Sequence, residues 1–131
     1  MLMVPVATLD ALKRAELSVS EYVNYKSQGD FFSPHLFCLQ GLSEQADTFA
    51  RHFGIPPDTY EDSFTGSASG CMLAYMWHHR LINKKRITAQ QGHWMQRPGQ
   101  AQLEVVGEPD CIETVKLIGS AVSVIKGELS I

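Results

Sequence analysis

Residues 61–68 are the part of the chain whose types and spacing best suit chemistry, because two acids precede a run of small residues. The pattern is typical of a loop that leads into a helix, and the first N–H groups of a helix have no partner within it. The helix dipole adds about half a positive charge there. Since Gly66, Ser67 and Ala68 are small, an anion can approach their N–H groups closely. The stretch therefore predicts a site for a carboxylate or a phosphate.

Asp62 would lie beside an anion bound at this helix start. A carboxylate does not attract an anion, so Asp62 is better suited to hold a substrate ammonium or hydroxyl, or to transfer a proton, and partial burial would raise its pKa toward the working range. Ser67 can add a hydroxyl donor, and Glu61 is interpreted as a solvated loop acid. A purely structural interpretation also fits: Thr65 or Ser67 caps the helix, and Gly66 only relieves crowding.

The histidines and cysteines do not form the pattern of a metal site. His78 and His79 are adjacent, and neighbouring side chains on a helix diverge by about 100°, so the pair is poorly placed to chelate one ion. No two cysteines form a CxxC pair, which disfavours a zinc site or a redox dithiol. We therefore expect no metal, and interpret the cysteines as reduced thiols buried like small apolar residues. The other residues concerned are His35, His52, His93, Cys38, Cys71 and Cys111.

The composition is that of a globular protein. Its 131 residues are 44% hydrophobic and 19% charged, which suits one domain with its own core. The formal net charge of -3 disfavours nucleic-acid binding, which needs a basic face. The apolar N-terminus is short and lacks a basic region, and the most apolar helical stretch, residues 71–77, is far below the ~20 residues that span a bilayer. We therefore expect residues 1–131 to form a single cytoplasmic domain with no membrane or nucleic-acid partner.

Apolar periodicity predicts short strands on both sides of residues 61–68. Residues 48–53 alternate most clearly, so successive side chains there point to opposite faces of a sheet. Thr8 can cap a short helix, residues 20–28 form a second one, and residues 54–58 form a loop by composition. The expected strands are residues 2–6, 36–40, 48–53, 87–89, 93–96, 101–106, 113–118 and 121–126.

One long helix is expected over residues 66–83, and its middle, residues 71–77, is apolar on every face. A helix without a polar stripe must be wrapped by other elements. The basic run of Lys84, Lys85 and Arg86 is interpreted as offsetting the dipole at the end of this helix. The simplest architecture is α+β, with a strongly curved, mixed β-sheet rolled around a central buried helix.

Residues 61–68 read Glu-Asp-Ser-Phe-Thr-Gly-Ser-Ala, which resembles the E-D-P-x-T-G-S-A signature of the PhzF-like (phenazine biosynthesis) family. Further stretches resemble the family in the same order, and the resemblance covers nearly the whole chain. They are residues 51–53, Gln91-Gly92, Arg97-Pro98-Gly99 and the closing residues 119–129. The chain departs from the signature at Ser63, which stands in place of proline and loosens the loop that holds Asp62.

The resemblance implies a diaminopimelate-epimerase-type fold, in which two similar domains each roll a sheet around a helix and the active site lies between them. Family members are cofactor-independent isomerases or epimerases, or have no known substrate, so no cofactor is expected. Residues 1–131 resemble the C-terminal domain, and the N-terminal domain, with its general acid/base glutamate and a histidine, has no counterpart here. By resemblance Asp62 is the catalytic aspartate. The substrate carboxylate is expected at Gly66 and Ser67, flanked by Thr65 and Ala68.

Three functions follow from this resemblance. In the first, a separate N-terminal-half protein completes the site, and the pair isomerises a small carboxylate-bearing metabolite by proton transfer. In the second, two copies of the chain face each other as a homodimer and mimic the complete fold. In the third, the chain is a non-catalytic module that binds a small acid, or a remnant with structural stability alone.

Overall fold

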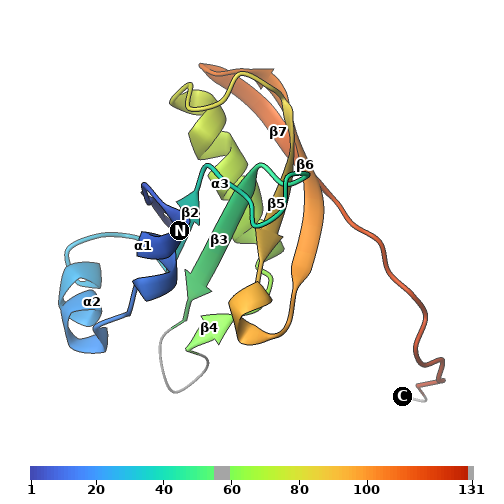
Figure 1. Cartoon of the computed structure of the whole chain (residues 1–131), viewed down its shortest axis with the longest axis horizontal. Coiled ribbons are helices and arrows are strands. Elements are labelled where there is room, and N and C mark those ends of the chain that lie inside the picture. The colour runs from blue at the N-terminus through green and yellow to red at the C-terminus, as the bar shows by residue number, and fades with distance from the viewer. Residues whose placement is uncertain (55–59, 130–131) are drawn as a thin grey trace.

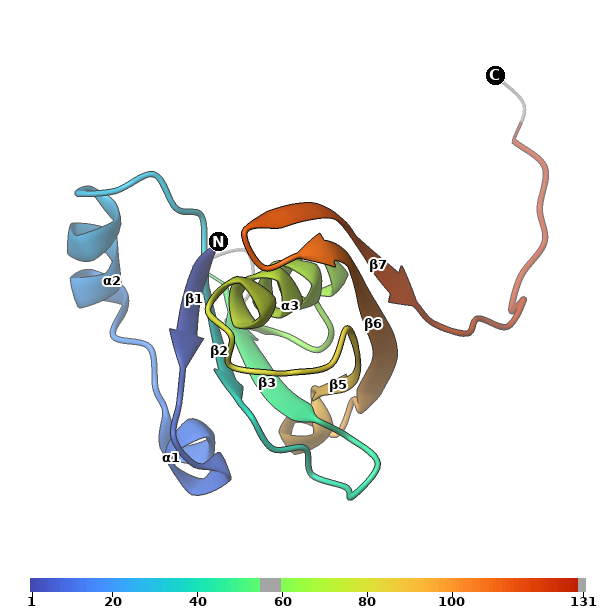
Figure 2. The same cartoon turned by 90° about the horizontal axis from the view of Figure 1, so that it is seen from above.

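A mixed seven-stranded sheet curls around the helix α3, as Figures 1 and 2 show in two views. The computed structural model describes residues 1–54 and 60–129. The strands are β1 (Leu2–Pro5), β2 (Pro34–Cys38), β3 (Thr48–Phe53), β4 (Glu61–Asp62), β5 (Arg86–Gln91), β6 (Gly99–Glu108) and β7 (Cys111–Ile118). The helices are α1 (Leu9–Arg14), α2 (Val19–Lys26), α3 (Gly66–His78) and a 3-10 turn, η1 (His93–Met95).

The sheet order is β1-β2-β3-β5-β6-β7, and the short β4 pairs with β3 beside this path. The β1-β2 and β3-β5 pairs are parallel, while the other pairs are antiparallel. In Figure 2 the strands curve around α3 from β1 on one side to β7 on the other. The predicted α+β fold, a curved mixed sheet around a central helix, is therefore confirmed.

The main core lies between α3 and the concave face of the sheet. Met72, Leu73 and Met76 of α3 are fully buried and pack with a cluster that includes Phe37 of β2 and Leu103 of β6. Burying each such side chain stabilises the fold by roughly 1.5–3 kcal/mol relative to exposing it. The helix that carries residues 66–68 is thus fixed by the largest block of apolar contacts in the described chain.

A second, smaller core lies on the convex face of the sheet. Because residues 48–53 form a strand with the predicted bounds and alternation, Ala50 points toward α3 while Phe49 points outward. Phe49 packs there with Leu12 of α1 and with Trp94, whose ring centroid is 4.4 Å from its own. Thr8 caps α1 as predicted, since its hydroxyl accepts a hydrogen bond from the Ala11 N–H.

The predicted helix over residues 66–83 is too long, because α3 ends at His78. Arg80 adopts a left-handed conformation, and the Leu81 N–H bonds the Met76 carbonyl, which is the Schellman pattern that terminates helices. The basic run therefore does not offset the helix dipole. Its three side chains instead form ion pairs with acids of the sheet and its loops: Lys84 with Asp47, Lys85 with Glu108 and Arg86 with Glu104.

One face of α3 is not wrapped, contrary to the prediction. Ser67 and Cys71 are exposed, and an open groove beside them is lined by small residues of α3 and by Val115 and Leu117 of β7. The prediction was wrong because it weighed composition alone, whereas small residues on this face remove the bulk that would fill the groove. Two of the three cysteines, Cys71 and Cys111, are likewise exposed rather than buried.

Two predicted strands are absent from the described residues. Residues 93–95 form η1 instead, because Gly92 and Gln96 on either side have positive φ angles that break an extended chain. Residues 119–129 form no strand and run away from the body of the molecule (Figure 1). Of the loop predicted at residues 54–58, only Gly54 lies among the described residues. None of the described helices combines the length and apolarity needed to cross a membrane.

Candidate functional site

Asp62 is held in β4, the short strand that immediately precedes α3. It lies opposite His52 in the antiparallel β3-β4 pairing, and the Thr65 hydroxyl donates a 2.6 Å hydrogen bond to its Oδ2. The sequence predicted a loop here, because two paired residues are too few to show periodicity. The strand and the Thr65 bond orient the carboxylate that the sequence predicted to do chemistry.

The start of α3 leaves backbone donors without helical partners. The first helical bond runs from the Ser69 N–H to the Thr65 carbonyl, so the N–H groups of the three residues between them are outside the ladder. Thr65 stands at the N-cap, but its side chain makes no capping bond and turns to Asp62 instead. The capping interpretation is therefore wrong for Thr65. Ser67 is exposed, whereas Ala68 is fully buried and can offer only its N–H.

The Gln91 side chain hydrogen-bonds the segment before α3 and so links it to the sheet. The sequence did not predict this role. Its amide nitrogen donates to the Asp62 carbonyl at 2.8 Å, and its amide oxygen accepts from the Thr65 N–H at 3.2 Å. The side chain is almost fully buried at the end of β5. The only sequence clue was the Gln91-Gly92 pair that resembles the family.

Two glycines of the resembling motifs let other strands approach residues 61–65. A Cβ on Gly92 would lie 2.3 Å from the Ser63 carbonyl oxygen, and its φ of +83° disfavours any other residue. A Cβ on Gly99 would lie 2.5 Å from the Phe64 ring. Gln91 at the end of β5, Gly92 just after it and Gly99 at the start of β6 therefore all pack against this segment. The stretches that resemble the family's later motifs are thus packed against the segment that carries the signature.

Glu61 has a structural partner and is not the solvated acid that the sequence suggested. Its two carboxylate oxygens accept hydrogen bonds from Arg51 Nε and Nη2 at 2.9 and 2.8 Å. Arg51 Nη1 also donates to the carbonyls of Leu12, Lys13 and Ala15 at the end of α1. Glu61 thus links β4 to α1 through Arg51, and Asp62 alone of the two acids faces His52.

A buried chain of polar groups extends behind Asp62. Ser33 Oγ lies 3.0 Å from His52 Nε2, and His52 Nδ1 lies 3.3 Å from His35 Nδ1. Burial lowers the pKa of His52, while the nearby Asp62 carboxylate opposes that shift. Burial and then the neighbouring His52 lower the pKa of His35 to about 3. Both rings are therefore neutral near pH 7, and the sequence, which showed only scattered histidines, did not predict this pair.

We expect Gln91→Leu to destabilise the fold by roughly 2–4 kcal/mol, since the Asp62 carbonyl and the Thr65 N–H would each lose a buried partner. Amide exchange at Thr65 should accelerate. Gln90→Leu is the matched control, because Gln90 is equally buried but bonds Leu42, Ser43 and Gln100 instead. Its cost in unfolding free energy should be similar, with Thr65 still protected. Slow exchange at Thr65 in Gln91→Leu would contradict the assigned role.

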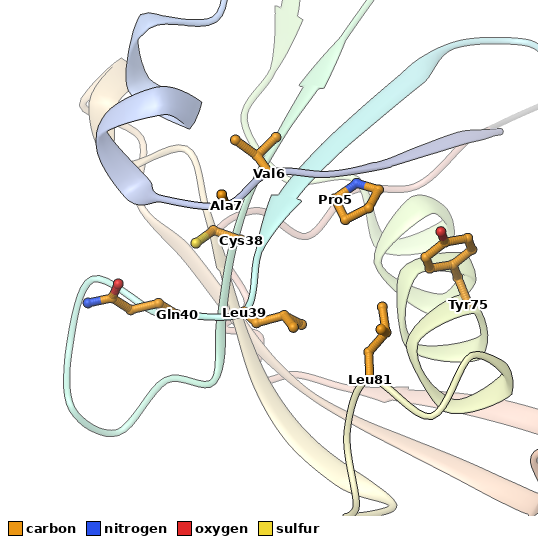
Figure 3. Close-up of a pocket in the computed structure, with 8 residues that line it drawn as sticks. All are labelled: Pro5, Val6, Ala7, Cys38, Leu39, Gln40, Tyr75 and Leu81. Carbon is orange, nitrogen blue, oxygen red and sulfur yellow. The ribbon is translucent and has the colours of Figure 1, made fainter.

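A cavity of about 510 Å³ lies toward the other end of α3 (Figure 3). It is bordered by Pro5, Leu39, Tyr75 and Leu81, and the polar Gln40 side chain points away from it. No residue of the predicted site lines it. Since it lacks converging polar groups, we place the candidate site at the start of α3 and not in this cavity. Within residues 1–54 and 60–129 no cluster of His, Cys, Asp or Glu could hold a metal ion.

The model of the family described as phenazine biosynthesis-like protein matches residues 1–127. An uncharacterized isomerase of Mesorhizobium japonicum is 29% identical over 98% of this chain and 44% of its own length. One of Bacillus subtilis is 29% identical over 91% of this chain and 41% of its own length. The chain thus spans less than half the length of these relatives.

Two solved structures share the fold. A putative phenazine biosynthesis PhzC/PhzF protein from Clostridium difficile superposes with a TM-score of 0.69 at 23% identity, covering 98% of this chain and 44% of that one. A PhzF-family protein from Bacillus anthracis superposes with a TM-score of 0.68 at 24% identity, covering 88% and 40%. At these identities the likeness concerns the fold alone.

Proposed function

The chain belongs to the phenazine biosynthesis-like family, and from this premise we propose that it forms one wall of the active site of an isomerase or epimerase. The substrate is a small molecule that bears a carboxylate. The observation that carries the proposal is the pairing of two features at one place: the open N–H groups that begin α3, and the carboxylate of Asp62 held beside them by Thr65.

The start of α3 binds the substrate, and Asp62 serves proton transfer. The start of α3, at Gly66 and Ser67, receives the substrate carboxylate, because donors and helix dipole there both favour an anion. Asp62 then lies near the atoms next to that carboxylate, where it can hold the substrate or carry a proton. In an isomerisation of this kind a proton leaves one carbon, the bonding electrons shift, and a proton returns to another carbon. The reaction therefore consumes no co-reactant.

In the family that the chain resembles, the general acid/base glutamate lies in the N-terminal domain, which has no counterpart in residues 1–131. Asp62 is the one acid of the described site that faces the start of α3, since Glu61 is held by Arg51. We therefore propose that residues 1–131 are the counterpart of the C-terminal domain, and that a second acid/base group comes from outside them. Its source is either a second copy of the chain or the family's N-terminal half as a separate protein.

The proposal is tested by proton exchange. Small carboxylic acids are incubated in D₂O with the chain, over a range of protein concentrations, and deuterium incorporation at carbon is followed by NMR. Exchange that rises more steeply than protein concentration supports a site completed by a second copy. Exchange that appears only after adding the N-terminal portion of the Bacillus subtilis relative supports the separate-half arrangement. Carboxylate binding without exchange in either mixture would refute the isomerase and leave the non-catalytic acid-binding module.

A further inference from the structure

His52 lies between His35 and Asp62 in one row of side chains that crosses three strands. His35 is opposite His52 in the β2-β3 pairing, and His52 is opposite Asp62 in the β3-β4 pairing. Residues that lie opposite each other in antiparallel strands project from the same face of the sheet. Ala50, two positions before His52, packs against α3, so the row lies on the concave face around α3. A charge on His52 would therefore act on the carboxylate of Asp62.

The hydrogen bonds of this row indicate which nitrogen of each imidazole carries the proton. A serine hydroxyl has one proton, and Ser33 donates its proton to the Met1 sulfur at 3.3 Å. The Ser33 oxygen then accepts at 3.0 Å from His52 Nε2, which must carry a proton. His52 Nδ1 is left bare and accepts at 3.3 Å from His35 Nδ1. Every proton then has an acceptor, whereas the opposite arrangement would bury an N–H at His35 Nε2, which has no partner within the described residues.

A second proton on His52 is opposed by its neighbours. It would have to bind Nδ1, where it would point at the proton on His35 Nδ1, and two donors cannot bond each other. His35 can yield only by moving its own proton to Nε2, which is buried and has no acceptor among the described residues, and a buried donor without an acceptor is costly. The environment as a whole acts in the same direction. Burial lowers the pKa of His52, the Asp62 carboxylate opposes this shift, and the α-amino group of Met1 adds to it.

We propose that His35 is a positioning residue that, through its Nδ1–H, keeps His52 neutral beside Asp62. A positive charge close to a carboxylate favours the charged form of that carboxylate, so a charged His52 would make Asp62 a poorer proton acceptor. Beside a neutral His52, Asp62 can take up a proton from the substrate and return it. This consequence for Asp62 rests on the proposed function, whereas the neutral state of His52 does not.

Nitrogen NMR of the imidazole rings tests the proton positions without any assay of turnover. In ¹⁵N-labelled protein the ring nitrogens of each histidine show which of them carries a proton. We expect the proton of His52 on Nε2 and that of His35 on Nδ1 at pH 7. On acidification His52 should stay neutral at pH values where a free histidine is already charged. A proton on His52 Nδ1, or a His52 ring that charges at the same pH as free histidine, would overturn the proposal.

His35→Asn separates the effect of the His35 proton from the effect of burial. The asparagine amide can turn either its oxygen or its NH2 group toward His52, so it can accept a hydrogen bond from a protonated Nδ1. We therefore expect His52 in this variant to become charged at a higher pH than in the wild type, as followed by the same NMR titration. An unchanged titration of His52 would show that burial alone keeps the ring neutral, and would refute the role of His35.

Proton exchange then measures what the charge on His52 does to Asp62. In a mixture that exchanges, the ratio of the rate at pH 6 to the rate at pH 8 should fall up to roughly tenfold in His35→Asn, since a nearby positive charge reduces the proton affinity of a carboxylate by about that factor or more. The double variant His35→Asn/His52→Gln cannot gain this charge and should return to the wild-type ratio, which a mere loss of stability would not do. A wild-type ratio in His35→Asn, or a low ratio in the double variant, would overturn the effect on Asp62.

This inference and the proposed function can fail separately. The expected proton positions in a protein that never exchanges would leave His35 as the residue that keeps His52 neutral, while the isomerase failed. Exchange by a protein whose His52 charges like free histidine would leave the isomerase standing and overturn the role of His35.

Discussion

Asp62→Asn is expected to slow proton exchange on small carboxylic acids by roughly 10²–10⁴-fold, the usual contribution of a positioned acid or base. Asparagine keeps the size of the side chain and an oxygen that can accept the Thr65 hydroxyl bond, but it carries no titrating proton. The start of α3 is unchanged by the substitution. Binding of the same acids, followed by calorimetry, should therefore stay within a few-fold of the wild-type affinity.

Glu61→Gln is the matched control for this experiment, because the two acids are adjacent in the sequence but differ in their partners. Losing the Glu61 charge weakens the two hydrogen bonds from Arg51, so we expect a lower unfolding free energy. The exchange rate of the folded protein should not change. Wild-type exchange by Asp62→Asn, or loss of exchange in Glu61→Gln alone, would remove Asp62 from the mechanism.

The protein should lose stability steeply as the pH falls below about 6.5. The ordinary pKa of histidine is 6.5, whereas burial holds the pKa of His35 at about 3. In this window the unfolded chain takes up a proton that the folded chain does not, so the unfolding free energy falls by about 1.4 kcal/mol per pH unit for this group. Because the unfolded histidine is only half protonated at pH 6.5, the loss between pH 6.5 and 4.5 is about 2 kcal/mol. The lowered pKa of His52 adds to it in the same direction.

The geometry explains why the folded protein resists this protonation. A charged ring carries protons on both nitrogens, but His35 is fully buried and its Nε2 has no hydrogen-bond partner within the described residues. His35→Gln removes the titrating group and keeps an amide that can bond His52. Urea unfolding of this variant between pH 7 and 4.5 should show a clearly shallower slope. His79→Gln, at an exposed histidine, should keep the wild-type slope, and equal slopes in the two variants would contradict the prediction.

Local patterns of residues were enough to predict the elements whose cause is local. The alternation of residues 48–53 specified β3 to the residue, because each side chain there faces one of two buried layers. The run of small residues after Asp62 located the start of α3. Because these side chains are small, a ligand can approach the unpaired N–H groups of the first helical turn. The apolar middle of the helix predicted a curved sheet around it, and the order of the resembling motifs indicated the family.

Which groups meet at the site depends on the three-dimensional fold and could not be predicted from local patterns. Gln91 bonds the Asp62 carbonyl from 29 positions away, and His35 meets His52 across two strands that are 17 positions apart at these residues. Such contacts depend on strand order and register, which residue types do not reveal. The same reason applies to the tail at residues 119–129: its pattern is that of a strand, but a strand exists only where another edge supplies its hydrogen bonds.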